Sequence, residues 1–351
     1  MLKVDPKVQK RNSSIELFRI IAMLFVVVVH CNGWLVGGIP DDFDEHNISL
    51  FRVSQATIQA FTCTCVNMFL LISGYFGLKL KWKSILNIYM LLISVTIPFY
   101  LVSCIIKMND FSLISLLGKF LAISKSGYFV ECYLLLMFFS PVFNAFVEKE
   151  GKRMLLWALA FWIVEIYFDF LKQDADLGFA EGYSFIHFVL IYMLGRTMSL
   201  YKEKFLRIQS FKYVILYLFS SLVILMGYVF LDMPSSYNYT SPFNIIASCS
   251  LFIIFARMTF YSKWINWIAS STFAVYIIHT HPPVFNWLKT IDNYMLLGYS
   301  YPKYLAMMGG VVFVVFVGSI LYDKIMKIFT VSIVSKVEQV TNNVKSRLSK
   351  T

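Results

Sequence analysis

The stretch RIIAMLFVVVVH, residues 19–30, decides the fold class of this chain. Its ten central residues are all apolar, and Arg19 and His30 stand at its two ends. A helix turns by about 100° per residue, so a step of eleven leaves the two side chains about 20° apart on one face and about 16 Å apart along the axis. We interpret the stretch as the centre of a first membrane span. Because a guanidinium and an imidazole are costly to keep inside a bilayer, we expect both to have a function.

The composition of the whole chain is that of a membrane protein. Of its 351 residues, 58% are hydrophobic and only 15% are charged, whereas soluble domains carry about 25% charged residues. The formal net charge is +11, but Lys and Arg cluster between apolar segments, as the positive-inside rule describes. No basic stripe with interleaved aromatic residues is present, so we expect no nucleic-acid partner. The partner that this composition predicts is the lipid bilayer.

The apolar runs predict an all-α integral membrane protein, a bundle of about ten transmembrane helices. Residues 110–124 are shorter than the about 20 residues that a span requires, so we expect an interfacial or re-entrant helix there. We expect both termini to be cytoplasmic, because the acidic loop at 39–49 then falls outside and the basic loops fall inside. Residues 1–327 would form the transmembrane domain and residues 328–351 a cytoplasmic amphipathic tail. The predicted spans are 16–36, 56–78, 84–106, 128–147, 154–171, 183–200, 213–231, 242–261, 270–288 and 304–322.

The two polar residues of the first span have a chemical interpretation. Neutral imidazole titrates near the working pH, which suits His30 as a general base. Arg19, on the same face, would bind an anion at the inner end of a cavity. The alternatives are a histidine that only packs against a neighbouring span, and an arginine that reaches back to the inner membrane surface.

His279 is a second histidine in an apolar setting. It falls near the middle of the predicted ninth span, shortly before Pro282 and Pro283. Prolines in a span free backbone carbonyls, and such breaks occur where helices line cavities. We therefore expect His279 in the active site, and the alternative is a histidine that caps the broken backbone. His46 and His187 have no comparable context, and the histidines lack the acid–histidine spacing of zinc sites, so we expect no metal.

The arrangement of a cation, ten residues and a histidine resembles the signature of the membrane-bound acyltransferase family 3 proteins. These are integral membrane O-acyltransferases that modify bacterial surface glycans. Four further segments resemble family motifs, follow in the family's order and cover the membrane part of the chain. They are Asn67–Phe76 with its Ser-Gly-aromatic ending, Tyr133–Asn144 closing in Ser-Pro and Asn, Tyr192–Arg196 with its Tyr-x-x-Gly, and Ser271–His279 with its Tyr and final His.

The resemblance implies transfer of an acyl group, usually acetyl from acetyl-coenzyme A. The donor would be cytoplasmic, and the acceptor would be a hydroxyl of an extracytoplasmic cell-surface polysaccharide or glycolipid at the bacterial plasma membrane. By position, His30 is then the catalytic histidine, Arg19 its companion at the donor's phosphate end, and His279 a further catalytic residue. The separation of about 16 Å between His30 and Arg19 is similar to the length of an extended pantetheine arm. Tyr133 would bind substrate.

Glu131 lies near the outer start of the predicted fourth span. We expect its carboxylate to orient His30 or to bind a sugar hydroxyl of the acceptor. The alternative is a solvated glutamate at the membrane interface.

The chain departs from the family after the second span, where paired arginines are usual. It has Lys79, Lys81 and Lys83 there, and Asn87 stands where a second cation is expected. Lysine binds phosphate as a point charge but lacks the guanidinium fork. We expect Lys81 and Lys83 to contact the donor, and the alternative is that these lysines only set the orientation of the span.

Two other functions fit the same features. Ten spans with charged residues inside them also fit a transporter or flippase for glycan or lipid-linked intermediates, although related halves are not visible. The chain would otherwise be a non-catalytic partner in glycan synthesis. If it is an enzyme, His30 either takes the proton from the acceptor hydroxyl or carries the acyl group itself.

Overall fold

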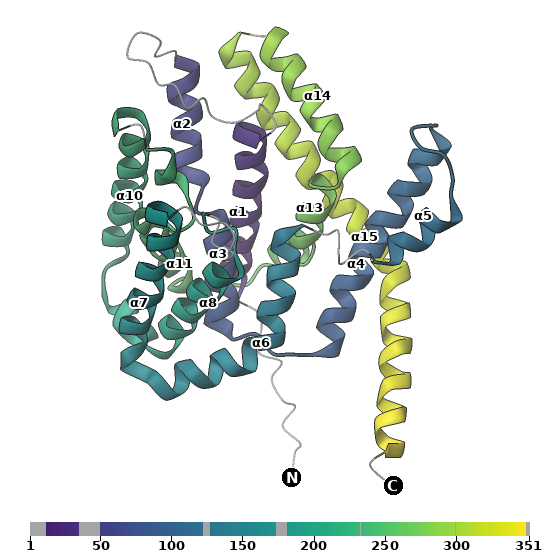
Figure 1. The fold of residues 1–351 in the computed structure, drawn as a ribbon, viewed down its shortest axis with the longest axis horizontal. Coiled ribbons are helices and arrows are strands. Elements are labelled where there is room, and N and C mark those ends of the chain that lie inside the picture. The colour runs from purple at the N-terminus through teal and green to yellow at the C-terminus, as the bar shows by residue number, and fades with distance from the viewer. Residues whose placement is uncertain are drawn as a thin grey trace.

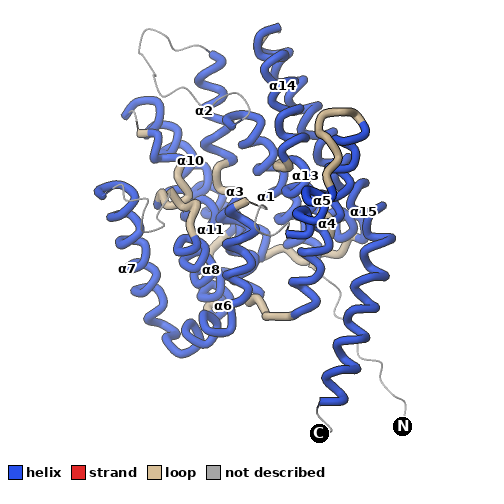
Figure 2. The backbone as a smooth tube through the Cα atoms, turned by 45° about the vertical axis from the view of Figure 1, so that its right-hand side comes forward, coloured by secondary structure: helices blue, strands red, loops and turns tan. Residues whose placement is uncertain are grey.

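A computed structural model of the chain describes residues 12–34, 50–121, 127–172, 181–231, 233–298 and 300–348. All regular structure in these residues is helical, which confirms the all-α class (Figures 1 and 2). Two helices continue as π-helix, α1 through His30–Trp34 and α7 through Tyr167–Lys172. The α-helices are α1 (Ser13–Val29), α2 (Leu50–Thr62), α3 (Cys65–Phe76), α4 (Trp82–Ile105), α5 (Leu113–Gly118), α6 (Tyr128–Glu150), α7 (Met154–Ile166), α8 (Phe185–Leu200), α9 (Lys202–Arg207), α10 (Ser210–Leu231), α11 (Pro242–Ala256), α12 (Lys263–Ala269), α13 (Thr272–His279), α14 (Pro282–Gly298) and α15 (Tyr301–Leu348).

Seven helical segments of the described chain are long and apolar enough to cross a membrane. The sequence predicted ten spans, and the difference has three causes. Tyr128–Asp169 counts as one segment of 42 residues, although it contains both the predicted fourth and fifth spans. The apolar helix Phe185–Leu200 has only 16 residues, fewer than the about 20 that span a bilayer. The predicted ninth span is divided between α13 and α14.

The division of the ninth span lies at the residues Thr280 and His281. Pro282 begins α14, and proline has no backbone N–H to continue the hydrogen-bond ladder of α13. The predicted second span has a milder break, a turn at Cys63 and Thr64 between α2 and α3. The chain thus contains short helices whose ends lie inside the bundle.

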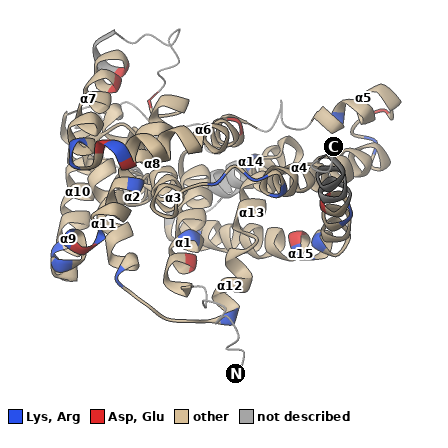
Figure 3. Ribbon diagram, turned by 90° about the horizontal axis from the view of Figure 1, so that it is seen from below, with Lys and Arg blue, Asp and Glu red and all other residues tan. Residues whose placement is uncertain are grey.

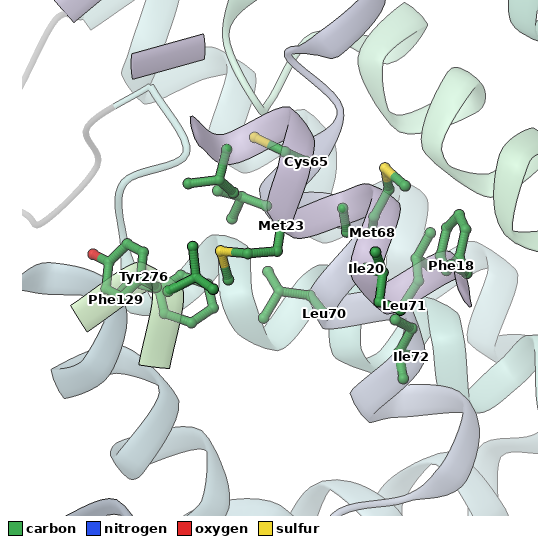
Figure 4. Packing of buried hydrophobic residues seen from close by; sticks show 14 of the residues in the cluster. Phe18, Ile20, Met23, Cys65, Met68, Leu70, Leu71, Ile72, Phe129 and Tyr276 are labelled. Carbon is green, nitrogen blue, oxygen red and sulfur yellow. The ribbon is translucent and has the colours of Figure 1, made fainter. Parts of the chain in front are cut away.

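The core is built around α1 and α3, which lie at the centre of the bundle in Figure 1. In that view α7 and α10 lie on the left, and α4, α5 and α15 lie on the right. The centre is filled by apolar side chains from α1 and α3 (Figure 4). Phe18 and Met23 of α1 and Met68, Leu70 and Leu71 of α3 are all buried. This packing holds α1 firmly, and α1 is the helix that carries Arg19 and His30.

Two glycines bring α3 and α8 close together. A Cβ atom at Gly74 would overlap the carbonyl oxygen of Tyr192, and one at Gly195 would lie 2.6 Å from the carbonyl oxygen of Leu71. Small residues at facing positions allow the backbones of membrane helices to approach closely. The Ser-Gly-aromatic and Tyr-x-x-Gly segments of the sequence therefore meet each other at this helix contact.

The N-terminal end of α1 is defined by local chemistry. The Asn12 side chain accepts a hydrogen bond from the Ser14 backbone N–H at 3.1 Å, as an N-cap residue does. The Ser13 hydroxyl donates to the Asn266 Oδ1 atom of α12 at 3.0 Å. These contacts place the start of α1 against α12.

The C-terminal helix α15 runs without interruption from Tyr301 to Leu348 and extends beyond the bundle (Figure 1). It therefore passes through residue 327, where the sequence predicts the start of the amphipathic tail. Ile333 and Val337 of the predicted tail are exposed. The side chains of Val340, Val344 and Leu348, also in this tail, lie outside those described.

Other expectations concern the loops. The predicted helix at 110–124 is a shorter helix, α5, which has an exposed surface. The acidic loop at 39–49, with His46, lies outside the described residues. Seen from below in Figure 3, Lys and Arg occur on several helices, among them α1, α9 and α15.

Candidate active site

The structure brings together the two histidines that the sequence analysis singled out. His30 is the first residue after α1, and His279 is the last residue of α13. The His30 Nδ1 atom lies 2.8 Å from the His279 Nε2 atom, and the ring centroids are 5.0 Å apart. His279 is only 2% exposed, whereas His30 is half-buried. A hydrogen-bonded histidine pair therefore joins the ends of two central helices.

The contacts of the pair assign its hydrogens. The His279 Nδ1 atom lies 2.6 Å from the Val275 carbonyl oxygen, which can only accept, so Nδ1 carries the proton. In neutral His279 the Nε2 atom is then an acceptor, and the His30 Nδ1–H donates to it. The proton of neutral His30 thus resides on Nδ1, and its Nε2 atom carries a lone pair. This is the tautomer that a general base acting through Nε2 needs.

Arg19 lies in a different setting from His30, about 16 Å away along the same helix. Its Nη1 atom forms an ion pair of 2.5 Å with the Glu16 Oε2 atom, and Glu16 is itself buried. The sequence analysis missed Glu16, although its position three residues before Arg19 is a spacing at which helical side chains meet. Glu16 fixes the guanidinium at the edge of a cavity.

Arg19, Lys79 and Lys81 line one cavity of about 520 Å³. It lies between α1, α3, α6 and the starts of α4 and α13. Among its described lining residues none is acidic, and Asn87 is one of them. An adjoining cavity of about 500 Å³ shares Arg19 and Tyr133 with it and also reaches Glu16. The first cavity combines three cations with a volume in the range usual for small-molecule sites.

A wall of aromatic rings stands between this cavity and the histidine pair. Phe129 and Phe273 line the cavity. The Phe129 ring lies 5.2 Å from the Tyr276 ring, which lies 6.0 Å from the His279 ring, centroid to centroid. Figure 4 shows Phe129 and Tyr276 side by side at the edge of the core. A chain of ring contacts therefore links the lining of the cavity to the histidine pair.

The remaining predicted site residues divide into two groups. Tyr133 and Lys81 lie in the cavity lining, and the Tyr133 hydroxyl is 3.4 Å from the Ser73 Oγ atom. Lys83 instead forms an ion pair of 2.7 Å with Glu338 of α15 and is not among the described lining residues. Glu131 is exposed on α6 and lines none of the cavities described here. Two helical residues i and i+2 lie about 200° apart, so the inward position of Tyr133 turns Glu131 outward.

His187, for which the sequence showed no context, is the centre of a buried polar cluster. Its Nδ1 atom lies 3.1 Å from the Glu165 Oε2 atom, and its Nε2 atom lies 2.7 Å from the Asn67 Oδ1 atom. Asn67 Nδ2 also donates to the Tyr239 carbonyl oxygen at 3.0 Å. The cluster ties α7 and α8 to α3, and α3 supplies lining residues of the cavity at Arg19.

The family comparison covers the part of the chain that contains these residues. The family model described as an acyltransferase domain matches residues 12–324, which is most of the chain and includes both histidines and all three cavity cations. Neither the search of curated proteins nor the search of solved structures found a match. The matched region contains the seven membrane-crossing candidates almost completely. The chain therefore belongs to acyltransferase family 3 and is a multi-pass membrane acyltransferase.

Proposed function

We propose that this protein moves an acyl group, in the first instance acetyl, from cytoplasmic acyl-coenzyme A to a hydroxyl of an extracytoplasmic cell-surface glycan. The observation that carries the proposal is that α1 and α13 each contribute both to the cation-lined cavity and to the histidine pair. Arg19 and His30 lie on one face of α1, and the cation-lined cavity reaches Phe273, six residues before His279 on α13. An anionic donor in the cavity would thus be aligned with the histidine pair.

The cavity fits the phosphate end of coenzyme A. Arginine binds phosphate with a planar fork of N–H groups, and lysine adds point charges. Arg19, Lys79 and Lys81 supply these groups from two segments of the chain. The pantetheine arm would then run along α1 toward Phe129 and Phe273, and these rings would shield the thioester from water.

The chemical step follows from the tautomer of His30. Its Nε2 atom takes the proton of the acceptor hydroxyl while the hydroxyl oxygen bonds to the thioester carbonyl carbon. When the tetrahedral intermediate collapses, the C–S bond breaks and the imidazolium returns the proton to the leaving thiolate. The products are an O-acyl ester and coenzyme A thiol, and His30 ends unchanged. His279 keeps the His30 ring oriented throughout, since its Nε2 atom holds the Nδ1–H.

The positive-inside rule supports the direction of transfer. Lys79 and Lys81 precede α4, and Arg19 lies in the first half of α1. Cations at one end of neighbouring spans are typical of the cytoplasmic side. A donor from the cytoplasm would therefore enter at the end of the cavity where these cations lie.

The test is transfer of radiolabelled acetyl from acetyl-coenzyme A to the glycan fraction of membrane vesicles. Vesicles with the wild-type protein should label the glycan, those with His30→Ala should not, and those with Arg153→Ala should label it normally. Arg153 is exposed in the turn between α6 and α7, so this variant controls for expression of an altered chain. Fluorescence-detected size exclusion would show that His30→Ala is folded.

A different function would give a different pattern. A transporter or flippase would move glycan intermediates across the vesicle membrane without labelling them from acetyl-coenzyme A. Normal labelling in folded His30→Ala vesicles would remove His30 from the chemistry and contradict the proposal.

A further inference from the structure

A cavity of about 740 Å³ lies between α4, α5, α13 and α14 and shares no lining residue with the donor cavity at Arg19. It is bounded by the break between α13 and α14, where Thr280 and His281 leave the regular helix. Membrane helices break in this way where freed polar groups line a cavity. The volume lies within the range of about 300–1,000 Å³ usual for small-molecule sites.

This cavity and the donor cavity lie end to end along two helices. On α4, Ile88 lines the donor cavity and Leu92 lines the second cavity. On α13, Phe273 lines the donor cavity and Ile277 lines the second cavity. Four residues correspond to about 6 Å of helix. One helical turn thus separates the two cavities on both helices, and His279 follows Ile277 by two residues.

The lining combines flat rings with hydrogen-bonding groups. Tyr100 and Trp287 supply rings, and Asn109 and Asn286 supply amides. The Thr96 and Thr280 hydroxyls donate to carbonyl oxygens of their own helices at 2.8 Å and 2.7 Å. Each threonine oxygen therefore remains available to accept a hydrogen bond from a ligand hydroxyl. Rings that cover C–H faces and groups that bind hydroxyls suit a sugar better than a lipid tail, which offers no hydrogen bonds.

The charge of the lining favours an acidic sugar. Lys119 lines the cavity, with its Nζ atom 5.2 Å above the Tyr100 ring, and the described lining residues include no Asp or Glu. The Nδ1 atom of His281 is buried and has no hydrogen-bond partner among the described residues. A buried polar atom without a partner is unfavourable, which indicates a place where a ligand group would bond. Carboxylates bind neutral sugars well, because they accept hydrogen bonds from the sugar hydroxyls. The described lining has no such carboxylate.

We infer that this second cavity binds the acceptor, and that the acceptor is a saccharide whose bound unit carries a carboxylate paired with Lys119. This inference rests on the proposed function, because it names the acceptor of that reaction. A donor cavity lined by Arg19 and two lysines then lies one helical turn along α4 and α13 from an acceptor cavity lined by rings, amides and Lys119. His279, at the end of α13, lies two residues after Ile277 of the acceptor lining.

The experiment measures acetyl transfer by the purified full chain in nanodiscs. The probes are short oligosaccharides of galacturonate, glucuronate and sialate, each compared with its carboxyl-reduced counterpart. The reduced probe has the same ring and linkage but no charge. We expect at least one acidic probe to be a substrate, with an acceptor KM about tenfold or more below that of its reduced counterpart, the effect of one charge-assisted hydrogen bond.

Two variants distinguish a specific contact with Lys119 from a general effect of positive charge on acceptor binding. Lys119→Glu should raise the acceptor KM for the acidic probe about tenfold or more and leave the acetyl-coenzyme A KM unchanged. Lys107→Asn is the matched control, because Lys107 is an exposed cation near the end of α4 and lies outside the described lining. Its φ of 58° is a left-handed value that asparagine tolerates. This control should leave both KM values unchanged.

The outcomes distinguish this inference from the proposed function. Transfer with equal KM for acidic and reduced probes, or an unchanged acceptor KM in Lys119→Glu, would overturn the acceptor assignment and leave the acyltransferase intact. If no probe is acetylated, direct binding of the acidic probes to wild type and Lys119→Glu decides the question. Binding that Lys119→Glu abolishes supports the cavity, and equal or absent binding rejects it. Failure of the wild type to label any glycan in the vesicle assay would instead reject the proposed function.

Discussion

His279 holds the His30 ring through a hydrogen bond of 2.8 Å between its Nε2 atom and the His30 Nδ1 atom. Its own Nδ1 atom is fixed by the Val275 carbonyl oxygen at 2.6 Å. The chain of contacts begins at the backbone of α13 and ends at the Nε2 atom of His30. A backbone carbonyl thus selects the tautomer of a residue 245 positions earlier in the chain, through one intervening ring.

Substitution of His279 tests its role as a positioning residue. In His279→Ala, His30 loses the acceptor that keeps its proton on Nδ1, so kcat should fall about ten- to a hundredfold, the cost of a lost buried hydrogen bond in the reacting state. The KM for acetyl-coenzyme A should not change, because His279 is not among the described lining residues of the donor cavity. His279→Gln offers a side-chain carbonyl as acceptor and should recover part of kcat. Equal kcat in the alanine and glutamine variants would contradict the tautomer argument.

Arg19 and Glu16 give a second prediction. Arg19→Ala should raise the acetyl-coenzyme A KM about tenfold or more, because a hydrogen bond to a charged group contributes about 1.5–3 kcal/mol. Arg19→Lys should recover part of the loss, since the charge remains but the fork is gone. Glu16→Gln should raise KM less, because it only loosens the 2.5 Å contact that orients the guanidinium. Steady-state kinetics measure all three, and a change in kcat alone would contradict a role in donor binding.

Lys81 and Lys83 form a matched pair for a third prediction. Lys81 lines the donor cavity, whereas Lys83, two residues later, pairs with Glu338. Lys81→Ala should therefore raise the donor KM several-fold. The donor KM of this variant should also depend less on salt concentration than that of the wild type, since one screened charge is removed. Lys83→Ala should leave kinetics unchanged, because exposed ion pairs contribute about 0–1 kcal/mol. If both variants behave alike, the lysines act only through the general charge of that surface.

The contact of α3 with α8 gives a prediction about stability. Gly74→Ala would drive a methyl group into the Tyr192 carbonyl oxygen, and overpacking of this kind costs about 1–3 kcal/mol. We expect a lower melting temperature in detergent. Gly310→Ala is the control, because a Cβ at Gly310 would meet nothing within 4 Å and α15 would gain a better helix former. Thermal unfolding followed by size exclusion measures both, and an unchanged melting temperature in Gly74→Ala would show that the helices can separate without loss.

The sequence predicted each member of the histidine pair but not the pair itself. His30 and His279 each stood out as a polar residue in an apolar run. Helical periodicity, however, does not relate two residues that are 249 positions apart on different helices. The same limit applies to the glycines. Gly74 and Gly195 belong to recognisable motifs, but their contact depends on which helices are neighbours.

Contacts between residues close in the sequence can be predicted from helical spacing alone. Glu16 precedes Arg19 by one helical turn, and that spacing alone indicates the ion pair. The outward position of Glu131 follows from the inward position of Tyr133, once either is known. Lys83 could not be separated from Lys81 by sequence, because its partner Glu338 lies 255 residues later, on α15, and no sequence pattern relates the two positions.

The wall formed by Phe129, Phe273 and Tyr276 has a consequence for the bilayer itself. Aromatic faces offer a hydrated ion no replacement for its water shell, so an ion in contact with these rings is poorly stabilised. Ring packing between the donor cavity and the histidine pair should therefore limit the leakage of protons and ions through this part of the protein.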